Sequence, residues 1–107
     1  MTEHERRRVE ARAQILKAVA HPSRLFIVEK LAERSHCVCE LTDMIGADTS
    51  TVSKHLSILR NAGIISHRKD GTTVHYSLVA PCLLRFLGCV EQVVEQSAKR
   101  QLAALDA

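Results

Sequence analysis

The chain has 107 residues, with fifteen Lys and Arg against twelve Asp and Glu, a formal net charge of +3 when its six histidines are counted as neutral. This length suits one domain, which we expect to span residues 1–107, and a core built from Leu, Ile and Val, because only three residues are aromatic. No apolar run approaches the ~20 residues of a membrane span, and the charged N-terminus lacks the apolar centre of a signal peptide, so we expect a cytoplasmic protein.

Two helices are predicted at the start of the chain. Residues 4–20 have apolar side chains at helical spacing, with Arg and Glu on the opposite face. Pro22 suits the first position of a second helix over residues 23–33, because a helix does not use the backbone N–H that proline lacks there. The positions expected to be buried in this second helix are Leu25, Phe26, Val28 and Leu31.

Cys37 and Cys39 flank Val38 just before the third helical run. In a cytoplasmic protein we expect such cysteines to be free thiols, metal ligands or redox sensors rather than structural disulfides, although either could also be a small buried apolar residue. Side chains two positions apart point about 200° apart on a helix and to opposite sides of a strand. A shared ion therefore requires a local distortion at the start of the third helix.

A short amphipathic run then ends at Gly46, and a tight turn leads to Thr49 and Ser50, either of which could cap the next helix. That helix is expected over about residues 50–62, buried on one face, polar on the other, and ended by Gly63 in a left-handed conformation. Its polar face is rich in hydroxyls, which together with Lys54 can approach base edges or phosphates in a major groove. Its predicted buried positions are Val52, Leu56 and Leu59.

Two β-like segments follow, residues 64–68 and 73–78, joined through Lys69-Asp70-Gly71, which is a strong hairpin signal. The basic tip of this predicted hairpin suits contact with a DNA backbone. Helix, tight turn, polar-faced helix and basic hairpin together predict a winged helix-turn-helix that reads DNA. The candidate DNA-binding residues are Ser50, Thr51, Ser53, Lys54, His55, Ser57, Arg60, Arg68 and Lys69.

A final helix is predicted from Cys82 to about Leu102, and we expect the polar tail over residues 97–107, which includes the end of this helix, to fray. The helix has more apolar residues than one covered face needs, which favours a two-fold dimer seam. Cys82 and Cys89 lie on nearly the same face but about 10 Å apart along the axis, too far to share one ion. A three-thiolate site would therefore combine Cys37 and Cys39 with one of these two, from the same or the facing subunit.

Three pieces of the sequence follow one another along the chain: HPSRLFIVEKL, CVCEL, and STVSKHLSILRNAGII with HRKDGTTVHYSL. Taken in this order, they resemble the ArsR/SmtB family of metal-responsive bacterial repressors. The first resembles the family's second helix, the second its arsenic and cadmium cysteine box, and the third its recognition helix and wing. The resemblance implies a mainly α fold with a small β-hairpin, in which four helices, the hairpin and a fifth helix form a winged helix-turn-helix that dimerises through its first and last helices.

The resemblance also implies a homodimeric repressor that blocks a promoter on double-stranded DNA and leaves it when an inducer binds Cys37 and Cys39. Our first expectation for the inducer is trivalent arsenic or antimony, As(III) or Sb(III), which favours three thiolates; no organic cofactor is expected. The chain departs from the family pattern at Thr42, where the arsenic branch often has a further cysteine. It also has no N-terminal cysteines and no His or Asp within residues 82–102, so Cys82 and Cys89 are the thiols left to complete the site.

Other functions remain open at this stage. A box cysteine with Cys89 could form a redox or reactive-sulfur switch. A soft divalent ion such as cadmium, lead or zinc could bind instead, with His36, His4 or Glu40 as weak candidates for a fourth ligand. An adaptor role for the polar helix would give weak DNA binding that hardly changes with salt. We expect no enzyme, because the sequence has no phosphate loop and no nucleophile–base signature.

Overall fold

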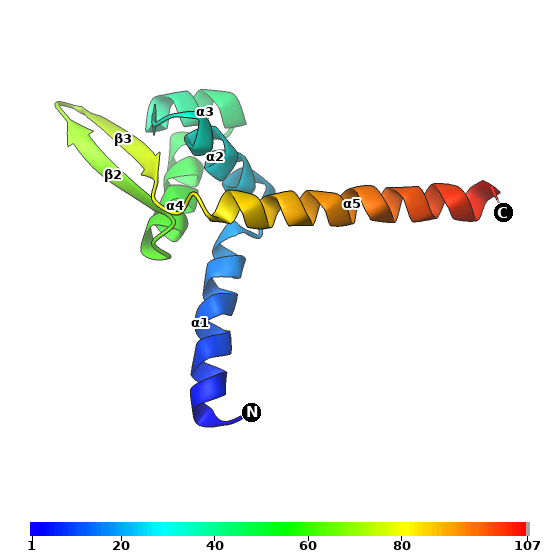
Figure 1. Cartoon of the computed structure of the whole chain (residues 1–107). Helices are drawn as coiled ribbons and strands as arrows, with labels where there is room; N and C mark the ends of the chain where they lie inside the picture. Colours follow the sequence, from blue (N-terminus) through cyan, green and yellow to red (C-terminus); the bar gives the residue numbers. More distant parts are fainter. Residues whose placement is uncertain (107) are drawn as a thin grey trace.

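The computed structural model describes residues 1–106, and these form five helices and a small antiparallel sheet (Figure 1). The strand order in the sheet is β1-β3-β2. The predicted winged helix-turn-helix is confirmed, with one additional strand ahead of the third helix. The helices are α1 (Glu3–Val19), α2 (Pro22–Glu33), α3 (Val38–Ile45), α4 (Thr49–Asn61) and α5 (Leu83–Asp106). The strands are β1 (His36–Cys37), β2 (Ile65–Asp70) and β3 (Thr73–Leu78).

Side chains before the first turn cap several of the helices. The His21 ring caps α2, because its Nδ1 accepts a hydrogen bond from the backbone N–H of Ser23 at 3.1 Å, and Pro22 occupies the first turn as expected. In α4 the cap is Asp48, whose carboxylate accepts from the Thr51 N–H at 3.1 Å. The prediction that Thr49 or Ser50 caps α4 was therefore wrong by one residue, because Asp48 is the last extended residue before the helix.

Two glycines bound the helix-turn-helix. Gly46 ends α3 with φ of 78° and Gly63 follows α4 with φ of 80°, both in the left-handed region that favours glycine. The turn between α3 and α4 is therefore as tight as the sequence indicated.

The wing is longer than predicted. Strand β2 continues through Asp70, which pairs with Thr73, so the turn consists of Gly71 and Thr72, and Gly71 has φ of 64°. On the other side of β3, His36 and Cys37 pair with Tyr76 and His75. The sequence did not predict the short strand β1, because two residues are too few to show the alternation of a strand. This strand forms only by pairing with β3, far along the chain.

The core lies between α2, α3, α4 and the base of the wing. Predicted Val28, Leu31, Val52, Leu56 and Leu59 are buried. In α2, however, Ile27 is fully buried whereas Phe26 and Leu25 are half-buried. Elsewhere the fully buried residues include Leu41 and Ile64.

The two terminal helices project away from this core in different directions (Figure 1). Only Ala18 and Val19 of α1 and Leu83 of α5 are buried. The radius of gyration is 17.0 Å, well above the ~13 Å of a compact domain of this size. Helix α5 continues to Asp106, so the predicted fraying over residues 97–106 was wrong, while Ala107 lies outside the described residues. Within residues 1–106, no helix combines the length and apolar character needed to cross a membrane.

Candidate nucleic-acid interface and thiol site

The outer face of α4 presents most of the predicted DNA-binding side chains to solvent. Ser50, Thr51, Ser53 and Lys54 are exposed, whereas Ser57 is half-buried. On the opposite face Val52, Leu56 and Leu59 have no exposed surface, which fixes how the helix is rotated. The polar side of α4 is therefore accessible to solvent along its N-terminal half. Arg60 is also exposed, near the C-terminal end.

His55 differs from its neighbours on α4. Its Nδ1 lies 3.2 Å from an Nη atom of Arg24, and its ring packs against the ring of His21 with 4.4 Å between centroids. Burial, then His21 and Arg24, lower the pKa of His55 below its ordinary value of 6.5. This side chain thus faces the junction of α1 and α2 as well as the helix surface.

The wing offers a second polar surface. Arg68 and Lys69 in β2 are exposed, and Arg68 pairs with His75 across the hairpin. The face that carries Arg68 and His75 borders a hollow of about 360 Å³, whose lining has hydroxyls, imidazoles and a guanidinium but no carboxylate. Such a lining suits phosphate oxygens. The lining residues are Ser35, Ser66, His67, Arg68, His75 and Ser77.

Cys37 and Cys39 are joined by a disulfide at the start of α3. This corrects two expectations: free thiols in this pair, and side chains that point apart unless the helix is distorted. The physical reason is the strand-to-helix transition. Cys37 is the N-cap, in extended backbone with φ of −79° and ψ of 161°, whereas Cys39 already lies in the helix. The change of backbone conformation between them brings both sulfurs to one point.

Polar contacts fix the position of this junction. Glu40 N–H donates to the Sγ of Cys37 at 3.3 Å, and the Glu40 carboxylate accepts from the Cys37 N–H at 3.3 Å, which completes a capping box. The same carboxylate lies 2.7 Å from Arg34 and 3.2 Å from Nδ1 of His36. Arg34, the Cys37 N–H and then His36 lower the pKa of Glu40 to about 2. Glu40 is therefore an ionised cap rather than a free ligand.

The remaining cysteines lie elsewhere. Cys82 precedes the first residue of α5 and Cys89 lies within it, and both are exposed, free thiols. Among residues 1–106, no three His, Cys, Asp or Glu side chains come close enough together to hold a metal ion. One subunit thus brings together Cys37 and Cys39 but adds neither Cys82 nor Cys89 to them.

The structure gives two residues, His36 and Arg24, environments that the sequence did not predict. His36 is buried at 4% exposure, and its Nε2 has no hydrogen-bond partner among the described residues. Arg24 is neither a free surface charge nor available to a phosphate, because its guanidinium donates to backbone carbonyls of α1 and to His55. Neither role has a local sequence signal, because both depend on contacts between separate elements.

Comparisons with known proteins agree with this geometry. A model of the arsR family of bacterial regulatory proteins matches residues 21–67. The uncharacterized HTH-type transcriptional regulator Rv0081 of Mycobacterium tuberculosis is 34% identical over 96 residues, covering 89% of this chain and 84% of that protein. The crystal structure of NolR from Sinorhizobium fredii superposes with a TM-score of 0.80 at 30% identity, over 87% of this chain and 93% of that one. A cadmium resistance transcriptional regulatory protein, the CadC homolog of Staphylococcus aureus, is 40% identical over 67 residues, 62% of this chain and 55% of that protein.

Proposed function

The chain belongs to the ArsR/SmtB family of DNA-binding bacterial transcriptional regulators, and we propose that it is a homodimeric repressor released from its operator through Cys37 and Cys39. One observation carries this proposal. The two sulfurs meet at the N-terminus of α3, and a tight turn at Gly46 connects α3 directly to the recognition helix α4. A chemical change at the sulfurs therefore acts on the element that holds the DNA-reading helix.

In the proposed complex the exposed polar face of α4 enters the major groove. Short hydroxyls and Lys54 contact base edges and phosphates, while Arg60 contacts backbone near the helix end. The wing residues Arg68 and Lys69 lie along the adjacent phosphates. The full proposed set is Ser50, Thr51, Ser53, Lys54, His55, Ser57, Arg60, Arg68 and Lys69.

A homodimer formed through α1 and α5 follows from the exposed apolar side chains of these two projecting helices. A single subunit leaves them in water, at a cost of roughly 25 cal/mol for each Å² of apolar surface. A two-fold pairing would bury them and would also place two recognition helices side by side for successive major grooves. The exposed apolar residues are Val9, Ile15 and Leu16 in α1, and Leu84, Phe86, Val90, Val93, Val94, Leu102 and Leu105 in α5.

We propose trivalent arsenic or antimony as the inducer. The sulfurs of Cys37 and Cys39 lie close together, so the reduced pair would supply two of the three thiolate ligands of the ion. The N-terminus of α3 favours the negative charge of these thiolates. The third thiolate would come from Cys82 or Cys89 of a second subunit, because these thiols are exposed on the helix that we assign to the dimer seam.

Operator release tests this proposal. Fluorescence anisotropy of a labelled operator, with the protein kept reduced, should show release by arsenite for the wild type. Cys37→Ser and Cys39→Ser should abolish the response, and one of Cys82→Ser and Cys89→Ser should weaken it. The other of those two variants then serves as the matched control. A wild-type response in all four variants would contradict thiolate sensing.

A second candidate is direct oxidation of the pair, which the disulfide between Cys37 and Cys39 favours. Two thiols would lose two protons and two electrons to form the S–S bond, while hydrogen peroxide takes up both and is reduced to two waters. This differs from the pairing of a box cysteine with Cys89 that the sequence suggested. Intact-mass analysis after peroxide would show a loss of two hydrogens that Cys37→Ser eliminates, whereas arsenite would add mass only to the reduced pair.

A divalent soft ion is the third candidate, supported by the name of the cadmium-related relative. A four-coordinate ion would need two ligands beyond Cys37 and Cys39. Glu40 is committed to its helix cap and Arg34, and His4 lies near the far end of α1. Release of the operator by cadmium at lower concentrations than arsenite would favour this candidate over the trivalent ions.

A further inference from the structure

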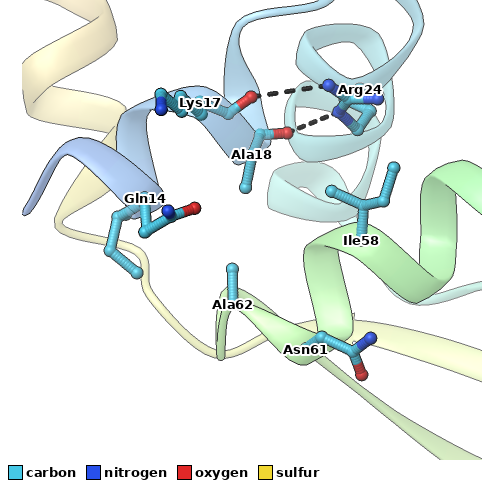
Figure 2. Close-up of a pocket in the computed structure, with 8 residues that line it drawn as sticks. Gln14, Lys17, Ala18, Arg24, Ile58, Asn61 and Ala62 are labelled. Atoms are coloured by element: carbon cyan, nitrogen blue, oxygen red, sulfur yellow. Dashed lines mark hydrogen bonds between the residues drawn. The ribbon is translucent and has the colours of Figure 1, made fainter. Parts of the chain in front are cut away.

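Arg24 connects three elements of the domain through one guanidinium group. Its Nε donates to the carbonyl oxygen of Ala18 at 2.6 Å and its Nη2 to that of Lys17 at 3.4 Å, both in the last turn of α1 (Figure 2). Its Nη1 lies 3.2 Å from Nδ1 of His55 in α4. Arg24 itself belongs to the first turn of α2. A single side chain thus joins the projecting helix α1 to the recognition helix.

Few other contacts fix the direction of α1. Only Ala18 and Val19 of this helix are buried. A hollow of about 560 Å³ lies between the last turns of α1 and the C-terminal half of α4, bordered by side chains such as Gln14 and Ile58 together with Arg24 (Figure 2). Side-chain packing between α1 and α4 is therefore confined to the last turn of α1, where Ala18 and Val19 join the core, and the hydrogen bonds of Arg24 add to it.

The direction of α1 matters because of its length. Seventeen residues make a helix about 25 Å long, so a change of 10° at its base moves its far end by about 4 Å. If α1 forms part of the dimer seam, that movement alters the separation of the two recognition helices, which must be ~34 Å to fit successive major grooves. We propose that Arg24 is a positioning residue that sets the angle between α1 and α4, and so the operator affinity of the dimer. This inference rests on the proposed function as a DNA-binding homodimer.

The contact with α4 requires an uncharged His55. A guanidinium only donates, so Nδ1 of His55 must carry the lone pair and the ring proton lies on Nε2. The ionisable groups that face this ring are Arg24 in α2 and His21 in the link before it, with the His21 ring 4.4 Å away. A second proton on His55 would place two positive charges in contact and break the bond between α2 and α4.

A lysine cannot replace the arginine here. The planar guanidinium directs three nitrogens at three acceptors, whereas an ammonium offers one nitrogen. Arg24→Lys therefore keeps the charge and removes the geometry, which separates positioning from simple charge. Arg6→Ala provides the matched control, because Arg6 is an exposed arginine of α1 with no side-chain hydrogen bond among the described residues.

The test measures operator affinity by anisotropy, per active dimer, from 50 to 300 mM salt, a range over which phosphate contacts strongly affect affinity. We expect Arg24→Lys to weaken binding about tenfold, within the range of known coupling effects, with the dimer intact by sedimentation and the salt slope unchanged. Arg6→Ala should bind within about twofold of the wild type. Binding by Arg24→Lys equal to the wild type would overturn the proposal, as would a salt slope reduced by about one in Arg24→Gln, which indicates a direct phosphate contact.

A second measurement needs neither DNA nor inducer. Removing the guanidinium should raise the pKa of His55, so the NMR titration of its ring in Arg24→Gln should shift to higher pH than in the wild type. An identical titration in both proteins would show that the contact has no effect and would overturn the proposal. Failure of the wild type to bind any duplex would instead contradict the proposed function, so the two failures are distinguishable.

Discussion

At the scale of single residues, the start of the recognition helix depends on Asp48. Its carboxylate accepts from the Thr51 N–H at 3.1 Å and from the Ser50 hydroxyl at 3.1 Å. Hydrogen bonds from Thr51, and then from Ser50, lower the pKa of Asp48 below its ordinary value of 3.8. Because the folded-state pKa is depressed, the stabilisation is complete above about pH 4 and is lost as the pH falls through the lower folded value.

Asp48→Ala should therefore destabilise the domain, because α4 loses the acceptor for one of its free N–H groups. We expect Tm at neutral pH to fall by a few degrees, on the order of 4–8 °C, as measured by circular dichroism. Asp48→Asn keeps a capping oxygen, so it should retain most of the Tm while losing the acid dependence.

Asp43→Ala is the matched control, since Asp43 is exposed near the end of α3 and makes no side-chain hydrogen bond within residues 1–106. A fall in Tm for Asp43→Ala as large as that for Asp48→Ala would show that lost charge, not the cap, causes the effect.

Single residues also show where sequence-based prediction ended. A cap can come from several adjacent polar residues, and only backbone geometry selects Asp48 over Thr49 or Ser50. Similarly, Cys37 and Cys39 meet because the first is a cap and the second is helical, so helical or strand spacing alone gave the wrong directions. The sequence identified the cysteines of the candidate site, but it did not predict that the sulfurs of Cys37 and Cys39 meet.

At the scale of elements, replacing a glycine by alanine has opposite effects on stability at two positions, according to the backbone conformation of each glycine. Gly46, with φ of 78°, ends α3 in the left-handed region. Gly88 lies within α5 on regular helical backbone. An added Cβ would meet no atom within 4 Å at either position, so only the backbone distinguishes them. Gly88 also lies about 160° around the helix from Val90.

We expect Gly46→Ala to destabilise the domain by about 1 kcal/mol, because alanine is strained in the left-handed region. Gly88→Ala should instead stabilise it by about 0.5–1 kcal/mol through reduced freedom of the unfolded chain. Urea unfolding of both variants and of the wild type at one protein concentration measures the change in the free energy of unfolding. Changes of the same sign in the two variants would contradict this account of the turn and of α5.

Elements with a strong local pattern were predictable, and those that depend on partners were not. The helices and the hairpin follow from apolar spacing and turn residues, whereas β1 has only His36 and Cys37 and exists because β3 passes beside it. The end of α5 shows the same limit. The polarity of residues 97–106 suggested fraying, yet helix-forming residues such as Ala98, Lys99 and Gln101 continue the helix to Asp106.

At the scale of the whole molecule, the two projecting helices have the greatest consequence. Val93 and Val94 in α5 are 59% and 57% exposed, although they belong to an apolar side that runs along the helix with Phe86 and Val90. An isolated subunit gains nothing from such a surface. Pairing of two subunits accounts for both the apolar side of α5 and the large radius of gyration.

Val94→Glu should therefore disrupt the dimer, because it places an unpaired carboxylate in the proposed seam. We expect sedimentation at micromolar concentration to show mostly monomer, and operator affinity to fall at least about 100-fold, since one recognition helix contacts only one half-site. The matched control is Gln92→Glu, which adds the same charge about 160° away on the polar side of α5 and should remain dimeric with affinity near that of the wild type. Dimers of Val94→Glu that bind as the wild type does would contradict the assignment of α5 to the seam. Monomers of both variants would show that charge anywhere on α5 is disruptive, and that the apolar side has no special role.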